Sequence, residues 1–367
     1  MQKRALWLGL AVTILSLSPA CGDAKNDKKD DSSDKKEEKD EKSGKKSDAS
    51  AKPAQSGSAA ALPAEQPTAP MASTAAGAAA HLTADCDIAG RLDVSKLLQH
   101  PGFKKELVPI IDEILATPAP KDEDFKKVQV FLKENNLDYK TALKDVVFCV
   151  QDVAGDTKFA VAVGGDFKPE TLVLAVDKQR TQKKVPIIDI DGRKAFSDDK
   201  FTAGQLADGT VVLSDKLDLF KAMNATSDAA TRVYKLETGK VMTAGTSEEA
   251  LTKAFAAKPP KKGGELFALM KTVRMNTDLD ANKTTIVIGC KSPEDATKLN
   301  AYITVAMSEF EKDPSKAPFP NAERLLKATK TSLTGSDVTI QISQDQAETD
   351  QAIKYAAEEL RKLKSKI

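Results

Sequence analysis

Few side chains in this sequence are of the types that carry catalysis or bind metals. Its two histidines are His81 and His100, and neither has a second ligand at metal-binding spacing. The four cysteines are Cys21, Cys86, Cys149 and Cys290. Proton transfer at neutral pH most often uses histidine, and a catalytic zinc needs three clustered protein ligands. We therefore expect no catalytic residue, no metal site and no cofactor, and we predict that the protein is not an enzyme.

Acidic residues leave two other chemistries open. Asp278-Leu279-Asp280-Ala281-Asn282 begins like a calcium-binding EF-hand loop, but Lys283 occupies the place of the required Gly and Gly289 that of the bidentate Glu. Asp198-Asp199 offers the paired carboxylates of glycoside hydrolysis, at a spacing that the sequence does not fix. A solvated loop is the simpler interpretation of both segments, so a hydrolase is only a third hypothesis.

The amino terminus has the layout of an export signal. Residues 1–4 are basic, residues 5–17 are apolar, and Ser18-Pro19-Ala20 places small residues before Cys21. A basic start, an apolar segment of about 7–15 residues and a small-residue cleavage site define a secretory signal peptide. A membrane-spanning helix needs roughly 20 apolar residues. We therefore predict a signal peptide at residues 1–20.

The residues before Cys21 add a second feature. Leu17-Ser18-Pro19-Ala20-Cys21 resembles the lipobox of bacterial lipoproteins, although Leu17 is one place early and Pro19 departs from the usual pattern. This resemblance implies a lipid on Cys21, which would anchor the mature chain to a membrane of the cell envelope. Gly22, rather than Asp, follows the cysteine, and the sorting habit of such lipoproteins then favours the outer over the inner membrane. An ordinary secretory signal is the alternative.

Residues 21–80 are predicted to be a lipidated cysteine followed by a disordered tether. Residues 23–48 are a nearly balanced mixture of Lys, Asp, Glu and Ser, and residues 49–80 are rich in Ala, Pro, Ser and Gly. Such segments cannot bury enough apolar surface to offset the entropy of ordering. A coil of this length spans roughly 40 Å. Because the charges balance, no nucleic-acid partner is expected.

From residue 82 onward, turn dipeptides alternate with apolar runs. Those at 155–156, 191–192, 208–209 and 335–336 each separate two such runs, which is typical of β-hairpins. Ser292-Pro293 and Thr246 to Glu249 have the capping patterns of helix starts. These patterns predict an α+β fold with a largely antiparallel sheet and packed helices.

One strand–helix unit recurs in this region. Residues 161–164 lead into Lys168-Pro169-Glu170, and residues 286–289 lead into Ser292-Pro293-Glu294. Two interpretations stay open: a duplication into α+β halves at 82–230 and 231–367, or chance similarity of short units. The layout resembles that of bacterial envelope proteins built from strand–helix repeats, and this resemblance brings no known activity.

Two of the cysteines are expected to form a disulfide. Cys86 falls in the first expected strand, residues 86–92, and Cys149 in the second, residues 146–153. Consecutive strands are usually neighbours, and exported proteins commonly contain disulfides. We therefore expect a Cys86–Cys149 bond that stabilises the fold by roughly 4 kcal/mol, with Cys290 left over. Three reduced thiols are the alternative.

Together, these features favour a membrane-anchored envelope lipoprotein that acts as a non-catalytic interaction or ligand-binding module. Its partner would be an envelope protein or a lipid. The second hypothesis is a carrier or chaperone for lipids or lipoproteins, with an apolar cavity.

The lipid anchor is tested by replacing Cys21 with Ser. Stable anchoring by acyl chains takes two signals, which a multiply acylated cysteine supplies without help from the protein surface. We expect Cys21→Ser to move the protein from the membrane fraction to the soluble fraction, as followed by immunoblotting. Unchanged membrane association of this variant would contradict lipidation.

Overall fold

The computed structural model describes residues 77–118, 136–153, 155–168, 187–190, 193–197, 201–224, 233–257, 264–313 and 326–364, with a few helical positions between 126 and 133. The signal peptide, Cys21 and the predicted tether up to residue 76 lie outside the described residues. Asp198-Asp199 and the 191–192 turn dipeptide lie outside them too.

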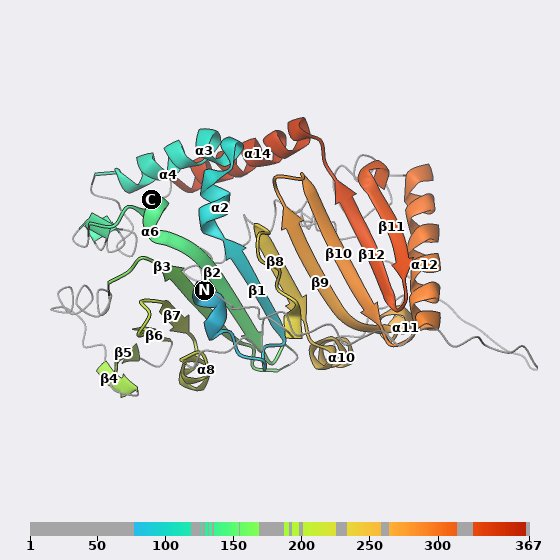
Figure 1. Cartoon of the computed structure of the whole chain (residues 1–367), viewed down its shortest axis with the longest axis horizontal. Coiled ribbons are helices and arrows are strands. Elements are labelled where there is room, and N and C mark those ends of the chain that lie inside the picture. The colour runs from blue at the N-terminus through green and yellow to red at the C-terminus, as the bar shows by residue number, and fades with distance from the viewer. Residues whose placement is uncertain are drawn as a thin grey trace, which may run out of the picture. The chain divides into compact units, whose positions relative to one another are not determined.

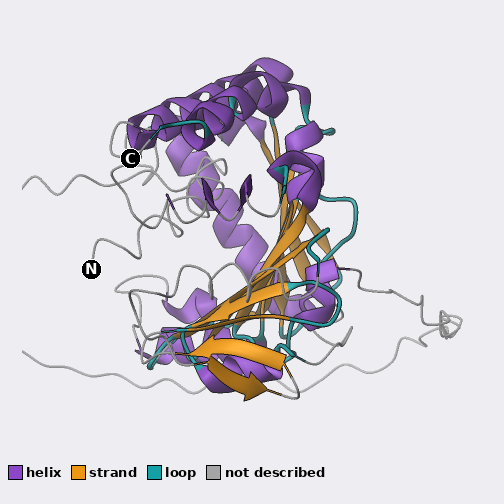
Figure 2. Ribbon diagram, turned by 90° about the vertical axis from the view of Figure 1, so that its left-hand side faces the viewer, coloured by secondary structure: helices purple, strands orange, loops and turns teal. Residues whose placement is uncertain are grey.

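Within the described residues, twelve strands form one antiparallel sheet in the order β11-β12-β10-β9-β8-β1-β2-β3-β7-β6-β5-β4 (Figure 1). The strands are β1 (Ile88–Asp93), β2 (Leu143–Gln151), β3 (Lys158–Gly165), β4 (Ile187–Ile190), β5 (Arg193–Ser197), β6 (Thr202–Gln205), β7 (Val211–Ser214), β8 (Met242–Thr246), β9 (Met270–Asp278), β10 (Lys283–Cys290), β11 (Thr329–Thr334) and β12 (Asp337–Ser343). Figure 2, which looks from the β4 end, shows the sheet nearly edge-on and strongly twisted. The predicted α+β class is confirmed.

Helices pack along this sheet. The described ones are the 3-10 helix η2 (Gly77–His81) and the α-helices α2 (Val94–Gln99), α3 (Pro101–Glu106), α4 (Val108–Leu115), α6 (Tyr139–Ala142), α8 (Leu217–Ala222), α10 (Glu248–Ala257), α11 (Gly264–Phe267), α12 (Pro293–Lys312) and α14 (Gln346–Lys364). Among the described helices, none is both long and apolar enough to cross a membrane.

Of the two helix starts predicted from capping residues, one is confirmed and the other lies one residue later than predicted. Ser292 caps α12 as predicted, since its hydroxyl accepts a hydrogen bond from the backbone N–H of Asp295 at 3.1 Å. The start of α10 was placed one residue early. Ser247 caps it by accepting from the N–H of Ala250, whereas the hydroxyl of Thr246 accepts from the N–H of Val273 within the sheet.

The four predicted hairpins are confirmed as β2–β3, β4–β5, β6–β7 and β11–β12. Gly209 and Gly335 take positive φ values of 90° and 57° in their turns, which only glycine adopts freely. The β9–β10 hairpin was missed, because its turn was compared with a calcium loop. The alternation of Val273 and Met275 with Arg274 and Asn276 was the available strand signal.

The sheet joins two halves of similar topology at its centre, where β1 pairs with β8. Each half carries a single strand, a long hairpin and a second hairpin that folds back beside the first. Counted outward from the central pair, the strand order is β1-β2-β3-β7-β6 in one half and β8-β9-β10-β12-β11 in the other. A duplication would produce this order. The order alone does not test it, so duplication stays a prediction.

The folded body begins earlier in the chain than predicted. The sequence placed residues 77–81 at the end of the tether, yet η2 packs on β2 and β3, and Ala78, Ala79 and Leu82 belong to the buried core. The backbone N–H of Ala78 donates to the carboxylate of Asp145 at 3.3 Å, and that carboxylate is also paired with Arg91 at 3.3 Å. The predicted boundary at residue 82 is therefore wrong for residues 77–81, which pack on the folded body. Short alanine-rich segments carry too little pattern to reveal this from the sequence.

Leu82, the first residue after η2, provides a test of the packing at the start of the folded body, because its side chain is 1% exposed. Truncating a fully buried leucine costs about 2–5 kcal/mol, whereas an exposed one costs little. We expect Leu82→Ala to lower the urea midpoint of unfolding clearly. Leu333→Ala, at a side chain that is 40% exposed, is the matched control and should change it little. Equal effects of the two substitutions would place Leu82 outside the folded body.

Candidate functional site

The first half of the sheet is apolar on both of its sides. One side is covered: Ala89, Val147, Cys149, Ala160, Ala162 and Val212 are buried against η2, α8 and Tyr234. Side chains alternate between the two sides of a strand, so their neighbours in β1, β2, β3 and β7 point the other way. Leu92 of β1 is one of these neighbours, and it packs against the buried cluster that includes Leu97 and Ile353. The others form what we call the apolar sheet face: Ile88, Val146, Phe148, Val150, Phe159, Val161, Val163, Val211 and Leu213.

Strand register brings these side chains into adjacent rows. Phe148 lies opposite Val161, which lies opposite Leu213, and the next row is Val146, Val163 and Val211. Side chains directly opposite each other in neighbouring strands are in contact range. Phe159 and Leu213 are 39% and 42% exposed, and the other members are half-buried. None of the nine belongs to, or packs against, the three buried core clusters that the described residues form.

The second half of the sheet offers an internal comparison. The covered side of the first half continues through Gly245, Arg274 and Val287. On the opposite side, α12 packs Ala296 and Leu299 against Ile288 and Val338. The side chains that point away from α12 are mostly polar: Thr272, Arg274, Asn276, Thr285, Thr339 and Gln341. An antiparallel sheet with one covered side normally alternates in this way, so the first half departs from the rule.

This departure determines what the apolar sheet face can do. Its nine side chains offer no proton donor or acceptor and no metal ligand. They can bind an apolar surface by excluding water, which contributes about 25 cal/mol for each Å² buried. Lysines at the strand ends are paired with carboxylates: Lys158 with Asp218 at 3.0 Å, and Lys216 with Asp156 at 2.9 Å. Lys158 has the alternation of Ala160 and Ala162, so it points to the covered side with α8 and not to the apolar sheet face.

His81 forms an unpredicted contact. The sequence placed it in the tether, but its side chain is buried and its Nε2 lies 2.8 Å from a carboxylate oxygen of Asp208. Burial, the largest single influence, raises the pKa of the Asp208 carboxyl, but the hydrogen bonds with His81 and with the backbone N–H of Thr210 together outweigh it and lower this pKa. The Nδ1 of His81 is buried without a partner in the described structure. The pair therefore lacks the nucleophile of a catalytic triad.

The acidic loop that begins like an EF-hand has its charges matched by lysines. Asp278 accepts from Lys240 at 2.8 Å, which holds the pKa of that carboxyl below its ordinary value. Asp280 pairs with Lys96, also at 2.8 Å. A calcium ion would have to displace both lysines. Over the ranges that the structure describes, no group of three or more His, Cys, Asp or Glu residues is placed to hold a metal ion.

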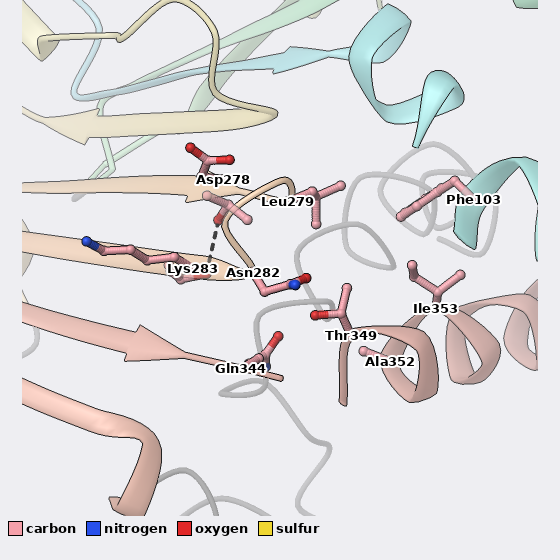
Figure 3. A pocket seen from close by; sticks show the side chains of 11 residues that line it. Phe103, Asp278, Leu279, Asn282, Lys283, Gln344, Thr349, Ala352 and Ile353 are labelled. Carbon is pink, nitrogen blue, oxygen red and sulfur yellow. Dashed lines mark hydrogen bonds between the residues drawn. The ribbon is translucent and has the colours of Figure 1, made fainter. Parts of the chain in front are cut away.

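A small cavity lies between the β9–β10 turn and α14 (Figure 3). Its volume is about 30 Å³, and its lining includes Phe103, Leu279, Asn282, Thr349 and Ile353. Pockets for drug-sized molecules have volumes of about 300 Å³ or more. This cavity therefore cannot serve as the apolar carrier cavity of the second hypothesis.

The structure describes the three cysteines that follow Cys21. Cys86 and Cys149 form a disulfide, with their Cα atoms 5.3 Å apart, and Cys290 is free and buried. One boundary differs, because Cys86 precedes β1 instead of lying within it. The hydroxyl of Tyr234 donates to the backbone carbonyls of Ala84 and Cys86, which holds the segment before β1 against the core. Burial raises the pKa of this hydroxyl.

Comparisons with known proteins add little to this description. No protein-family model and no curated protein sequence matches the chain. Crystal forms III and I of TP0453 are similar to it with a TM-score of 0.41 each, at 8% and 10% sequence identity. In both cases the alignment covers 77% of this chain and 98% of that chain. A likeness of this size carries no argument about function.

The disulfide can be tested in the purified protein. Peptide mapping without reductant should recover Cys86 joined to Cys149, and Cys290 as a free thiol. The bond joins residues 63 positions apart, so reduction should lower the free energy of unfolding by roughly 4 kcal/mol. Cys290→Ser is the control and should leave the bridge intact. A bridge between Cys86 and Cys290, or a free Cys86, would contradict the pairing.

Proposed function

We propose that the protein is a lipid-anchored module of the bacterial cell envelope that binds an apolar partner through the apolar sheet face and carries out no catalysis. Cys21 would attach it to the membrane, with the outer membrane favoured over the inner. The predicted tether would let the folded body reach a partner near the bilayer.

The observation that carries this proposal is the contrast between the two halves of the sheet. In the second half, apolar side chains face α12 and polar ones point away. In the first half, nine apolar side chains point away from the covered core, and Phe159 and Leu213 are well exposed. Contiguous exposed apolar surface on a folded protein commonly marks a binding site. Within the described residues, neither the His81–Asp208 pair nor the acidic loop supplies a competing reactive centre.

A partner protein is the favoured occupant, and a lipid is the second candidate. The shape of the face supports a lipid as the second candidate. A row of valine and phenylalanine side chains can bind the acyl chain of a lipid as well as a protein surface. This candidate now rests on an open face and not on the cavity that the sequence-based hypothesis assumed.

Leu213→Asp tests the face itself. The side chain is 42% exposed, so an aspartate there stays hydrated and should leave the fold intact, while it places a charge in the binding surface. We expect the substitution to reduce partner capture at least tenfold. Val305→Asp, on the outer side of α12 at 58% exposure, is the matched control and should leave capture unchanged.

Capture is measured with a photo-crosslinking amino acid at position 161 in the full-length protein, in cells, and by native mass spectrometry after gentle extraction. A crosslinked protein that disappears in Leu213→Asp supports the favoured occupant. A bound lipid that disappears in the same variant supports the second. Equal capture by Leu213→Asp and the wild type, or none from position 161, would contradict a role for the face.

A further inference from the structure

The cavity beside α14 contains polar atoms whose orientation is fixed by a chain of side-chain amides. Asp350 is a carboxylate, which only accepts hydrogen bonds, so Gln346 must present its Nε2 to it, at 2.9 Å. The Oε1 of Gln346 then faces Asn282 and accepts from its Nδ2 at 3.0 Å. Consequently the Oδ1 of Asn282, and not its amide nitrogen, is turned toward the cavity.

Two buried oxygen atoms meet at this cavity. The Oδ1 of Asn282 and the Oγ1 of Thr349 are buried and have no hydrogen-bond partner within the described part of the chain. Both residues line the cavity, and Thr349 is only 3% exposed. In Figure 3 the two side chains point into the space between the β9–β10 turn and the start of α14, and Phe103, Leu279 and Ile353 also line this cavity. An unsatisfied polar group of this kind normally costs stability.

We infer that this cavity is the site of a buried structural water that bridges Asn282 and Thr349. The volume of about 30 Å³ is enough for one molecule. Water fits the chemistry of both atoms: it donates to the Oδ1 of Asn282, which only accepts, and it donates to or accepts from the hydroxyl of Thr349. A cation would need more oxygen ligands, and the nearby carboxylate of Asp278 is already paired with Lys240.

The bridge would attach the last helix to the sheet. Asn282 closes the β9–β10 turn with a positive φ of 47°, and its backbone carbonyl accepts from the N–H of Gln344 just before α14. Thr349 lies in the first part of α14. The water would therefore complete a polar junction whose other contacts are the Asn282–Gln346 and Gln344–Asn282 hydrogen bonds. Ile353 of α14 packs into the neighbouring core with Phe103.

Thr349→Val separates a hydrated junction from a dry one by the sign of its effect. Valine has nearly the shape of threonine but lacks the hydroxyl. If a water is bound, the variant removes one of its hydrogen bonds, and the thermal midpoint of the full-length protein should fall. In a dry cavity, the variant would remove an unpaired buried hydroxyl, and the midpoint would rise. Thr297→Val, at an exposed position in the first part of α12, is the matched control.

A second measurement does not depend on the variant. A crystal structure of the wild type, at a resolution that shows ordered solvent, should contain one water within hydrogen-bond distance of both oxygens. A rise of the midpoint in Thr349→Val would overturn the inference. A direct hydrogen bond between Thr349 and Asn282, with no density between them, would overturn it as well.

Discussion

The continuity of the sheet depends on the pairing of β1 with β8 at its centre. Gly90 lies opposite Ala244, and Gly245 lies opposite Ala89. A Cβ at Gly90 would lie 2.3 Å from the Phe148 ring, and one at Gly245 would lie 2.7 Å from the carbonyl oxygen of Tyr234. Glycines in strand interiors often mark such close approaches. Without this seam, each half would end in an unpaired edge strand, which is prone to aggregation.

The same seam sets the character of the two sides of the sheet. Tyr234 fills one side and joins the covered core, where the disulfide and η2 also lie. Phe148 fills the other side and belongs to the apolar sheet face. Because a single sheet runs through both halves, covering elements placed on opposite sides leave one side of each half largely uncovered. In the first half, Leu92 at the seam still packs against the cluster that includes Ile353 of α14. The second half resolves this with polar side chains, and the first half does not.

Much of the fold followed from local patterns, because hairpin turns and helix caps are encoded by neighbouring residues. Gly209, Gly335 and Ser292 did what their types predict. The apolar sheet face could not be predicted from the sequence. When the side chains on both sides of a strand are apolar, the strand has the pattern of one that is buried on both sides. The His81–Asp208 contact joins residues 127 positions apart, and no local pattern encodes it.

The position of η2 bears on how the apolar sheet face would be used. η2 packs on the side of β2 and β3 that is opposite this face, so it leaves the face open. Ala78 and His81 attach η2 to Asp145 and Asp208, which belong to β2 and to the β6–β7 turn. These contacts make η2 part of the covered core. A partner at the apolar sheet face would therefore not have to displace η2.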